Sequence, residues 1–192
     1  MCINLALWRA TNLASLPSEL PVRRKTYRIV FHPLRNECLD PLSPREVDFV
    51  LGNARMLRKA GGEFAHRLLR GKNLGLLCES ADGVDATRFR RAAVELGARV
   101  AHIRPDFSEA SAPEVLQQTA RMLGRLYDAI ECQGLPSSLV QKIEQEAGVP
   151  VFDGVACANH ATARLATMLG SEVSPDEGRQ AVLQAVLVGL IP

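Results

Sequence analysis

The chain has 192 residues, of which 47% are hydrophobic and 23% charged, and its net charge is +2. The weak charge and the 5% aromatic content argue against a nucleic-acid-binding protein. No apolar run reaches the roughly 18 residues of a membrane-spanning helix, and the 5 cysteines follow no metal-ligand or C-x-x-C spacing. We therefore expect a cytoplasmic protein with reduced thiols, no membrane or nucleic-acid partner, and no metal or other cofactor.

Residues 1–41 differ from the rest of the chain because they are rich in arginine, poor in acidic residues and interrupted by prolines. We interpret them as a basic N-terminal extension that contains one short strand, TYRIVF. No apolar segment there is followed by a small-residue cleavage site, which argues against a secretory signal. The basic run VRRK is typical of a solvated turn, with an anion site as the alternative.

Helix signals become regular after residue 42. Ser43 and Glu46 form a capping box around Pro44, which predicts an amphipathic helix from that point. Short apolar runs then alternate with helical patterns. The apolar runs predict strands at NLGLLCE, ARVAHIR, YDAIEC and VPVFDG. The remaining segments predict helices at TRFRRAAVELG, APEVLQQTARMLGRL, SSLVQKIEQEAG and NHATARLATMLG, the second of them beginning with a capping box of Ser111 and Glu114.

This alternation predicts right-handed βαβ units. The expected fold class is α/β, with a parallel four-stranded sheet and helices on both faces. We assign this domain to residues 42–170. A further capping box, Ser174 with Glu177, predicts a C-terminal helix within residues 171–192 that packs back on the domain.

Ligands of such sheets bind at the carboxyl ends of the strands, near a switch in strand order. The loops to search are therefore 79–86, 105–111, 133–137 and 154–160. None of them contains a G-x-G-x-x-G or a P-loop motif, which argues against dinucleotide and P-loop nucleotide binding.

Four segments together resemble the N-terminal, carbamoyl-phosphate-binding domain of aspartate and ornithine carbamoyltransferases: LRGKNLGLLCES, TRFRRAAVELGARVAHIRPD, TARMLGRLYDAIECQG and AGVPVFDGVACANHATARLATML. The resemblance runs in continuous order over about residues 42–170. The last helix resembles the segment that, in full-length members, returns from the amino-acid-binding second domain to pack on the first. The resemblance implies that this chain joins that helix directly to the first domain, without the second, and that its ancestors served amino acid metabolism.

The resemblance also implies a phosphate-binding loop after the first strand, which in the family reads Ser-Thr-Arg-Thr-Arg. The corresponding residues here are Asp82, Gly83, Val84, Asp85 and Ala86. Carbamoyl phosphate is a dianion, and a protein binds it through cationic side chains and the backbone amides at a helix N-terminus. Val84 replaces the family arginine, and the carboxylates of Asp82 and Asp85 would repel a phosphate by like charge.

The other family positions are altered as well. Gln133 stands for an arginine after the third strand, and an amide cannot supply charge. The H-P-x-Q motif keeps only its histidine, His160, which is either a capping residue or a remaining carbonyl donor. In the family, a neighbouring subunit contributes a loop to the site. That loop corresponds to residues 107–114 here, which lack the matching Lys and Gly-Glu-Ser element. Arg88 and Arg104 could replace lost cations, although Arg88 is typical of a solvated helix face.

The candidate ligand-binding residues are Asp82, Gly83, Asp85, Arg104, Gln133 and His160, with His160 as the catalytic candidate. Two functions follow. The first is a non-catalytic carbamoyltransferase homologue, a pseudoenzyme that assembles with itself as a trimer, as the family does, or with a full-length paralogue. The second is an active ornithine or aspartate carbamoyltransferase, or a small-anion binder, with a site rebuilt around His160. A metal bridged by Asp82, Asp85 and Glu79, and a remnant fold without activity, stay open beside them.

Overall fold

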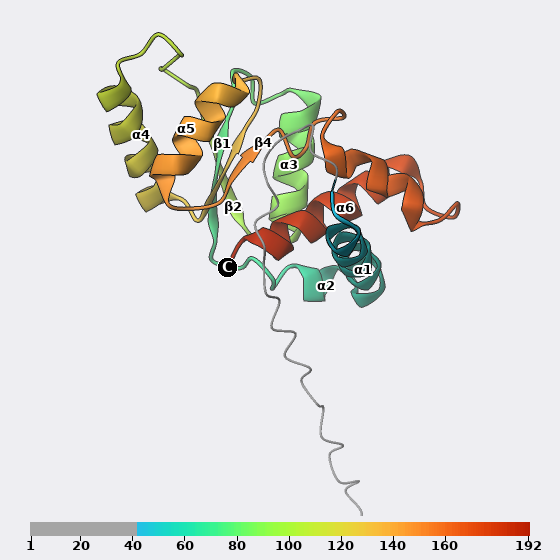
Figure 1. The fold of residues 1–192 in the computed structure, drawn as a ribbon. Coiled ribbons are helices and arrows are strands. Elements are labelled where there is room, and N and C mark those ends of the chain that lie inside the picture. The colour runs from blue at the N-terminus through green and yellow to red at the C-terminus, as the bar shows by residue number, and fades with distance from the viewer. Residues whose placement is uncertain (1–41) are drawn as a thin grey trace, which may run out of the picture. The chain divides into compact units, whose positions relative to one another are not determined.

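The structure, a computed structural model, describes residues 42–192. These residues form a parallel four-stranded sheet in the order β2-β1-β3-β4, so the predicted α/β fold class is confirmed (Figure 1). The expected strand TYRIVF lies outside the described residues. The strands are β1 (Asn73–Leu77), β2 (Arg99–Ile103), β3 (Ala129–Cys132) and β4 (Val151–Asp153). The helices are α1 (Pro44–Ala60), α2 (Gly62–Ala65), α3 (Val84–Glu95), α4 (Pro113–Leu126), α5 (Ser137–Ala147), the 3-10 helix η1 (Ala161–Leu169) and α6 (Pro175–Leu190).

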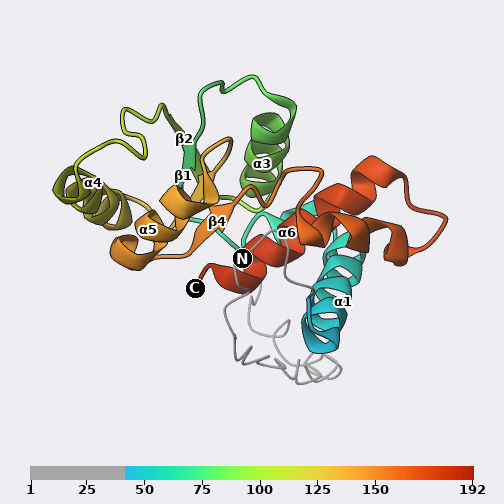
Figure 2. The same ribbon diagram turned by 45° about the horizontal axis from the view of Figure 1, so that its top comes forward.

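Helices cover both faces of the sheet. Figures 1 and 2 both show α4 and α5 on one side and α1, α3 and α6 on the other. The buried residues divide accordingly into two clusters, one around α1, α3, η1 and α6, the other around α4 and α5. Alternate residues of β3 supply the two sides, because Ala129 belongs to the first cluster while Ile130 and Cys132 belong to the second.

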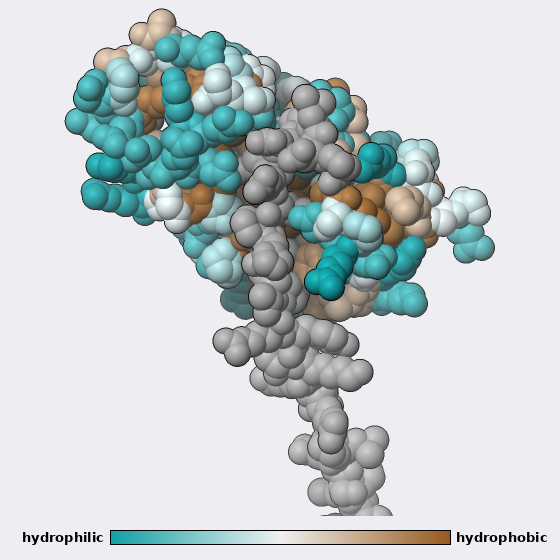
Figure 3. All heavy atoms as spheres, viewed as in Figure 1, coloured by the Kyte–Doolittle hydropathy of each residue, from teal (hydrophilic) through white to brown (hydrophobic). Residues whose placement is uncertain are grey.

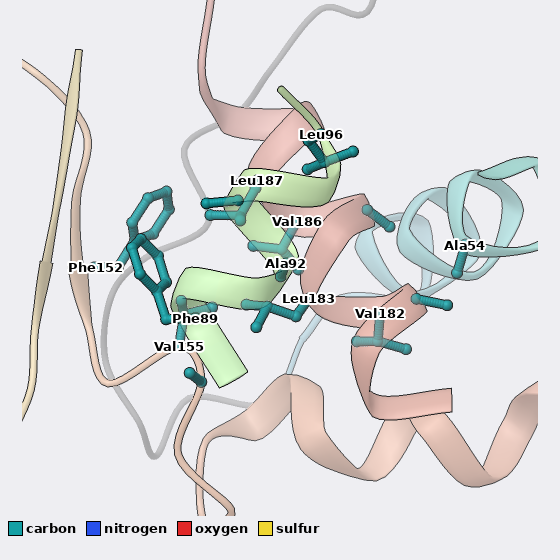
Figure 4. Packing of buried hydrophobic residues seen from close by; sticks show 14 of the residues in the cluster. Ala54, Phe89, Ala92, Leu96, Phe152, Val155, Val182, Leu183, Val186 and Leu187 are labelled. Carbon is teal, nitrogen blue, oxygen red and sulfur yellow. The ribbon is translucent and has the colours of Figure 1, made fainter. Parts of the chain in front are cut away.

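The first cluster holds α6 firmly against the domain. Leu183 and Leu187 of α6 pack with Phe89 and Leu96 of α3, while Val182 faces α1 (Figure 4). Leu187 and Phe89 are completely buried. Each such side chain contributes about 1.5–3 kcal/mol relative to its exposed state. The C-terminal helix is therefore an integral part of the core.

Local sequence signals explain where α1 and α6 begin. The capping boxes of Ser43 with Glu46 and of Ser174 with Glu177 are both formed, each with proline in the first helical turn. The predicted capping box of Ser111 is wrong. Proline sits at the start of α4, which makes Ala112 the N-cap, and the Ser111 hydroxyl instead accepts a hydrogen bond from the Ser108 amide at 2.9 Å.

Two predicted helices also differ in extent or type. The helix after β1 begins at Val84, three residues before the expected Thr87, because Gly83 takes the N-cap position. The helix expected over residues 159–170 is the 3-10 helix η1, whose first turn is closed by a bond from the Ala163 amide to the His160 carbonyl (2.9 Å).

The surface differs between the two sides of the sheet. In the view of Figure 3, hydrophilic residues cover most of α4 and α5, whereas apolar residues show near α1 and η1. Met56 of α1 and Met168 of η1 are both partly exposed. Within residues 42–192, no helix is long and apolar enough to cross a membrane.

Candidate functional site

The strand order places a switch point between β1 and β3. The chain leaves β1 through α3 towards β2 and leaves β3 through α5 towards β4, so the two connections diverge onto opposite faces of the sheet. Ligands of open parallel sheets bind at the carboxyl ends of the strands that flank such a point. The candidate site is therefore built from the segments after β1, β3 and β4.

The segment after β1 leads directly into α3. Gly83 is the N-cap, and Val84 is 73% exposed. Asp85, in the first turn of α3, accepts a hydrogen bond from Arg88 at 2.8 Å. Asp82 is exposed. The positively polarised helix terminus thus carries its own carboxylate, which is paired with Arg88 of the same helix.

The segment after β3 begins with Gln133. Its backbone amide donates to the Leu77 carbonyl at 2.8 Å, which ties it to β1. Its side-chain Nε2 donates to Glu131 Oε1 at 3.0 Å. One amide donor of Gln133 is therefore used inside the protein.

Glu131 is a site residue that the sequence analysis missed. Its side chain is fully buried, and it accepts hydrogen bonds from the amides of Val155 (3.2 Å) and Ala156 (3.4 Å) as well as from Gln133. Burial raises the pKa of Glu131 to about 8, against the lowering effect of these donors. A signal was present, because strands buried on both faces are nearly all apolar and a glutamate in AIEC is exceptional.

The β4–η1 loop, residues 154–160, is held by two arginines. Arg88 donates to the Ala156 carbonyl at 3.2 Å. Arg179 of α6 donates to the carbonyls of Ala156 (3.0 Å), Cys157 (2.9 Å) and Ala158 (3.4 Å). Burial and, to a smaller extent, Arg88 lower the pKa of Arg179. The role of Arg179 was also missed, because it depends on α6 packing back on the domain.

His160 ends this loop and is the N-cap of η1. Its Nδ1 accepts a hydrogen bond from the Thr162 amide at 3.3 Å and lies 2.8 Å from the Thr162 hydroxyl. Burial lowers the pKa of His160. The neutral imidazole therefore caps a helix through one nitrogen.

The structure separates Arg104 from Gln133 and His160. Arg104 is exposed and follows β2, which pairs with β1 on the side away from β3. Two strand spacings, about 9–10 Å, thus lie between the ends of β2 and β3. In the part of the chain that the structure describes, no group of three or more His, Cys, Asp or Glu residues could hold a metal ion. The acidic residues after β1 therefore do not form the metal site considered from the sequence.

Comparisons with known proteins agree with this fold. Residues 38–171 match the family model described as aspartate/ornithine carbamoyltransferase, carbamoyl-P binding domain. Ornithine carbamoyltransferase of Actinobacillus pleuropneumoniae is 40% identical over 127 residues, which cover 65% of this chain and 38% of that protein. The corresponding protein of Cutibacterium acnes is 39% identical over 130 residues, which cover 66% and 38%. The matched region thus spans little more than a third of these curated relatives.

Solved structures give the same result. Ornithine carbamoyltransferase from Pyrococcus furiosus superposes with a TM-score of 0.53 at 26% identity and covers 65% of this chain and 40% of its own. The anabolic ornithine carbamoyltransferase from Campylobacter jejuni, with a TM-score of 0.54 at 20% identity and coverage of 67% and 41%, shares the fold. With the family model matched over most of the described residues, the chain belongs to the aspartate/ornithine carbamoyltransferase family through its carbamoyl-phosphate-binding domain.

Proposed function

We propose that this chain acts by binding a protein partner and does not catalyse carbamoyl transfer. The observation that carries the proposal is the first turn of α3, where the family places its phosphate loop. An apolar side chain, Val84, replaces the arginine there, and the Asp85 carboxylate is paired with Arg88. An incoming dianion would have to displace that carboxylate from its arginine against like-charge repulsion.

The segment after β3 supports the same proposal. Gln133 has no charge, and one of its amide donors is already bound to Glu131. Arg88 and Arg179 donate to backbone carbonyls of the β4–η1 loop, and Arg90 donates to the Ala81 carbonyl in the segment after β1 at 3.2 Å. The cations close to the switch point are therefore engaged in holding the protein together.

We further propose that the partner is a second copy of this chain, in a trimer, or a full-length carbamoyltransferase, in the cytoplasm. Family membership supports this proposal. Light scattering after size exclusion tests it, with the chain alone and mixed with ornithine carbamoyltransferase. We expect a trimer or a mixed complex, and a monomer in both samples would contradict the proposal.

Calorimetry with carbamoyl phosphate tests the loss of the ligand site. We expect no saturable heat at millimolar ligand. A variant that restores the first four residues of the family loop, D82S/G83T/V84R/D85T, should gain binding, because it supplies the missing arginine and hydroxyls on the same helix terminus. Ala86 is left unchanged because it is buried in the first cluster. The matched control, D82N/D85N, removes the two negative charges without adding a cation and should bind more weakly than the restored loop. Saturable binding by the unmodified chain would overturn the proposal.

A second candidate function is carbamoyl transfer, or binding of another small anion, at a rebuilt site. The observation in its favour is that Arg88 and Arg179 both reach the loop that ends at His160. Citrulline formation from ornithine and carbamoyl phosphate, and carbamoyl aspartate formation from aspartate, test it directly. Activity that disappears in H160N would establish this candidate, whereas no turnover in either assay would reject catalysis.

A further inference from the structure

Two sets of groups hold the β4–η1 loop from opposite directions. The loop amides of Val155 and Ala156 point to the Glu131 carboxyl, and the loop carbonyls point to Arg88 and Arg179. The two sets meet at Ala156, whose N–H binds Glu131 and whose carbonyl accepts from both arginines. We propose that Glu131 is a proton-controlled lock: with its proton bound it keeps the β4–η1 loop closed over the end of β3, and loss of the proton opens the loop.

The closed loop excludes water from the carboxyl group. Glu131, Ala156 and Thr162 are 0%, 0% and 2% exposed, and Val155 is 4% exposed. Figure 4 shows Val155 near Phe89, in the apolar cluster between the sheet and α3. A protonated carboxyl still accepts hydrogen bonds through its oxygens and costs less to bury than an ionised carboxylate, which is much more stable in water. Ionisation therefore favours the state in which the loop has moved and water has entered.

The charged and titratable groups around Glu131 either favour its protonated form or are engaged with other groups. Asp153 of β4 lies beside it and adds to the rise of its pKa. Burial raises the pKa of the thiols of Cys78, after β1, and of Cys132, on the same strand. Across the loop, Arg88 is paired with Asp85, and Arg179 is bound to three carbonyls, one of them that of Cys157.

His160, at the end of the loop, has a pKa lowered by burial and is uncharged in the neutral and alkaline range. Burial moves the pKa of Cys78, Cys132 and His160 away from pH 8 and raises that of Glu131 to about 8, so among these four groups it is Glu131 that changes charge there.

The sign of the pH dependence follows from proton linkage. In the closed state burial raises the pKa of Glu131 from 4.5 to about 8, and in the open state water returns it towards 4.5. Between these values the closed state binds one more proton than the open state. The open fraction should therefore rise with pH by up to about tenfold per unit and level off above pH 8. Since the loop ends at His160 and Glu131 also holds Gln133, opening rearranges both candidate residues.

Amide hydrogen exchange, followed by NMR and expressed as protection factors, tests the lock. We expect protection at Val155 and Ala156 to fall by up to about tenfold per pH unit between pH 5.5 and 8. The variant E131Q keeps the shape and the acceptor oxygen but cannot ionise, so its loop protection should be independent of pH. The amide of Ile143, in the second cluster, reports global unfolding and should stay more protected than the loop.

Several outcomes would overturn the lock: equal pH slopes in both proteins, a flat profile in the unmodified chain, or loop amides that exchange only together with Ile143. If E131Q fails to fold, ¹³C NMR of the Glu131 carboxyl in the unmodified chain decides the question. A midpoint near 8 that coincides with shifts of the loop amides supports the lock, and a midpoint near 4.5 refutes it. Neither result depends on carbamoyl phosphate binding or on oligomeric state, so this inference and the proposed function can fail separately.

Discussion

The face of α3 that packs on α6 and the first turn of the same helix differ in their surroundings. Phe89, Ala92 and Leu96 are fully buried in the first cluster. A few residues earlier, Val84 is exposed and Asp85 is paired with Arg88, at positions that the resemblance assigns to the phosphate-binding loop. One helix therefore carries both a buried packing surface and a partly exposed first turn. Fold stability and ligand chemistry depend on different residues, so one can change while the other is kept.

Polar contacts between α3 and α6 define how the two helices are aligned. Glu95 of α3 accepts hydrogen bonds from Gln180 (2.9 Å) and Gln184 (2.7 Å) of α6, and Arg91 donates to Gln180 at 3.1 Å. Gln180 is nearly buried, so its amide needs these partners. The contacts define how far α6 is shifted and turned along α3, which apolar packing alone specifies less precisely.

The largest effect is expected in the packed face. L187A should lower the free energy of unfolding by about 2–5 kcal/mol, because it removes a fully buried side chain between α6 and α3. Urea denaturation measures the change. The volume-conserving control L187M should cost less than about 1.5 kcal/mol. A loss below about 1 kcal/mol for L187A would mean that α6 is not integral to the core.

The second cluster should respond to added volume. Gly124 lets α4 approach α5 closely, and a Cβ there would lie 1.8 Å from the Ala147 carbonyl oxygen. G124A should therefore cost about 1–3 kcal/mol or more, since backbone has to move. In the control G52A, on α1, the added Cβ has nothing within 4 Å, and alanine should stabilise the helix by up to about 1 kcal/mol. Equal effects of the two changes in urea denaturation would contradict the close contact.

His160 lies between the buried core and the candidate site, and its substitution should have a smaller, pH-dependent effect on stability. Because burial lowers its pKa in the folded state, the unfolded chain binds more protons as the pH falls below about 6.5, and stability is lost there. H160N keeps a side-chain acceptor for the Thr162 amide. Its stability should fall less than that of the unmodified chain between pH 7.5 and 5.5. Parallel curves in denaturant titrations at these pH values would argue against a neutral, buried imidazole.

The smallest effect on stability is expected in the first turn of α3. D85N removes the pair with Arg88 and a carboxylate from the first turn of α3, but this pair is partly exposed. We expect a loss below about 1 kcal/mol in urea denaturation. The control R88Q should cost more, because Arg88 also binds the Ala156 carbonyl. A larger loss of unfolding free energy for D85N would show that the first turn of α3 contributes to stability as strongly as the face that packs on α6.

Much of the fold was predictable because its signals are local. The capping boxes of Ser43 and Ser174 form as predicted, and the alternation of strands and helices indicates the parallel sheet. The start of α4 was not, because Pro113 occupies the first helical position and places the N-cap at Ala112 and not at Ser111. The capping box and the N-terminal proline predict helix starts one residue apart, and the sequence does not state which one prevails.

The candidate site was predictable only where a motif could be aligned. The resemblance located Asp85, Gln133 and His160, but their bonding partners come from other elements. Glu131 is buried by a loop more than twenty residues away, and Arg179 reaches that loop from the C-terminal helix. Neither contact is encoded by spacing along the chain.

Composition, hydrophobic periodicity and caps were enough to specify an α/β domain, because each acts over a few neighbouring residues. The resemblance assigns residues 82–86 to a phosphate-binding loop. The tertiary structure decided which charges meet: the pairing of Asp85 with Arg88, the enclosure of Glu131 and the arginines on the β4–η1 loop. The reason is physical, since burial and proximity set the energy of a charge, and both depend on segments that are brought together only when the sheet and α6 have packed.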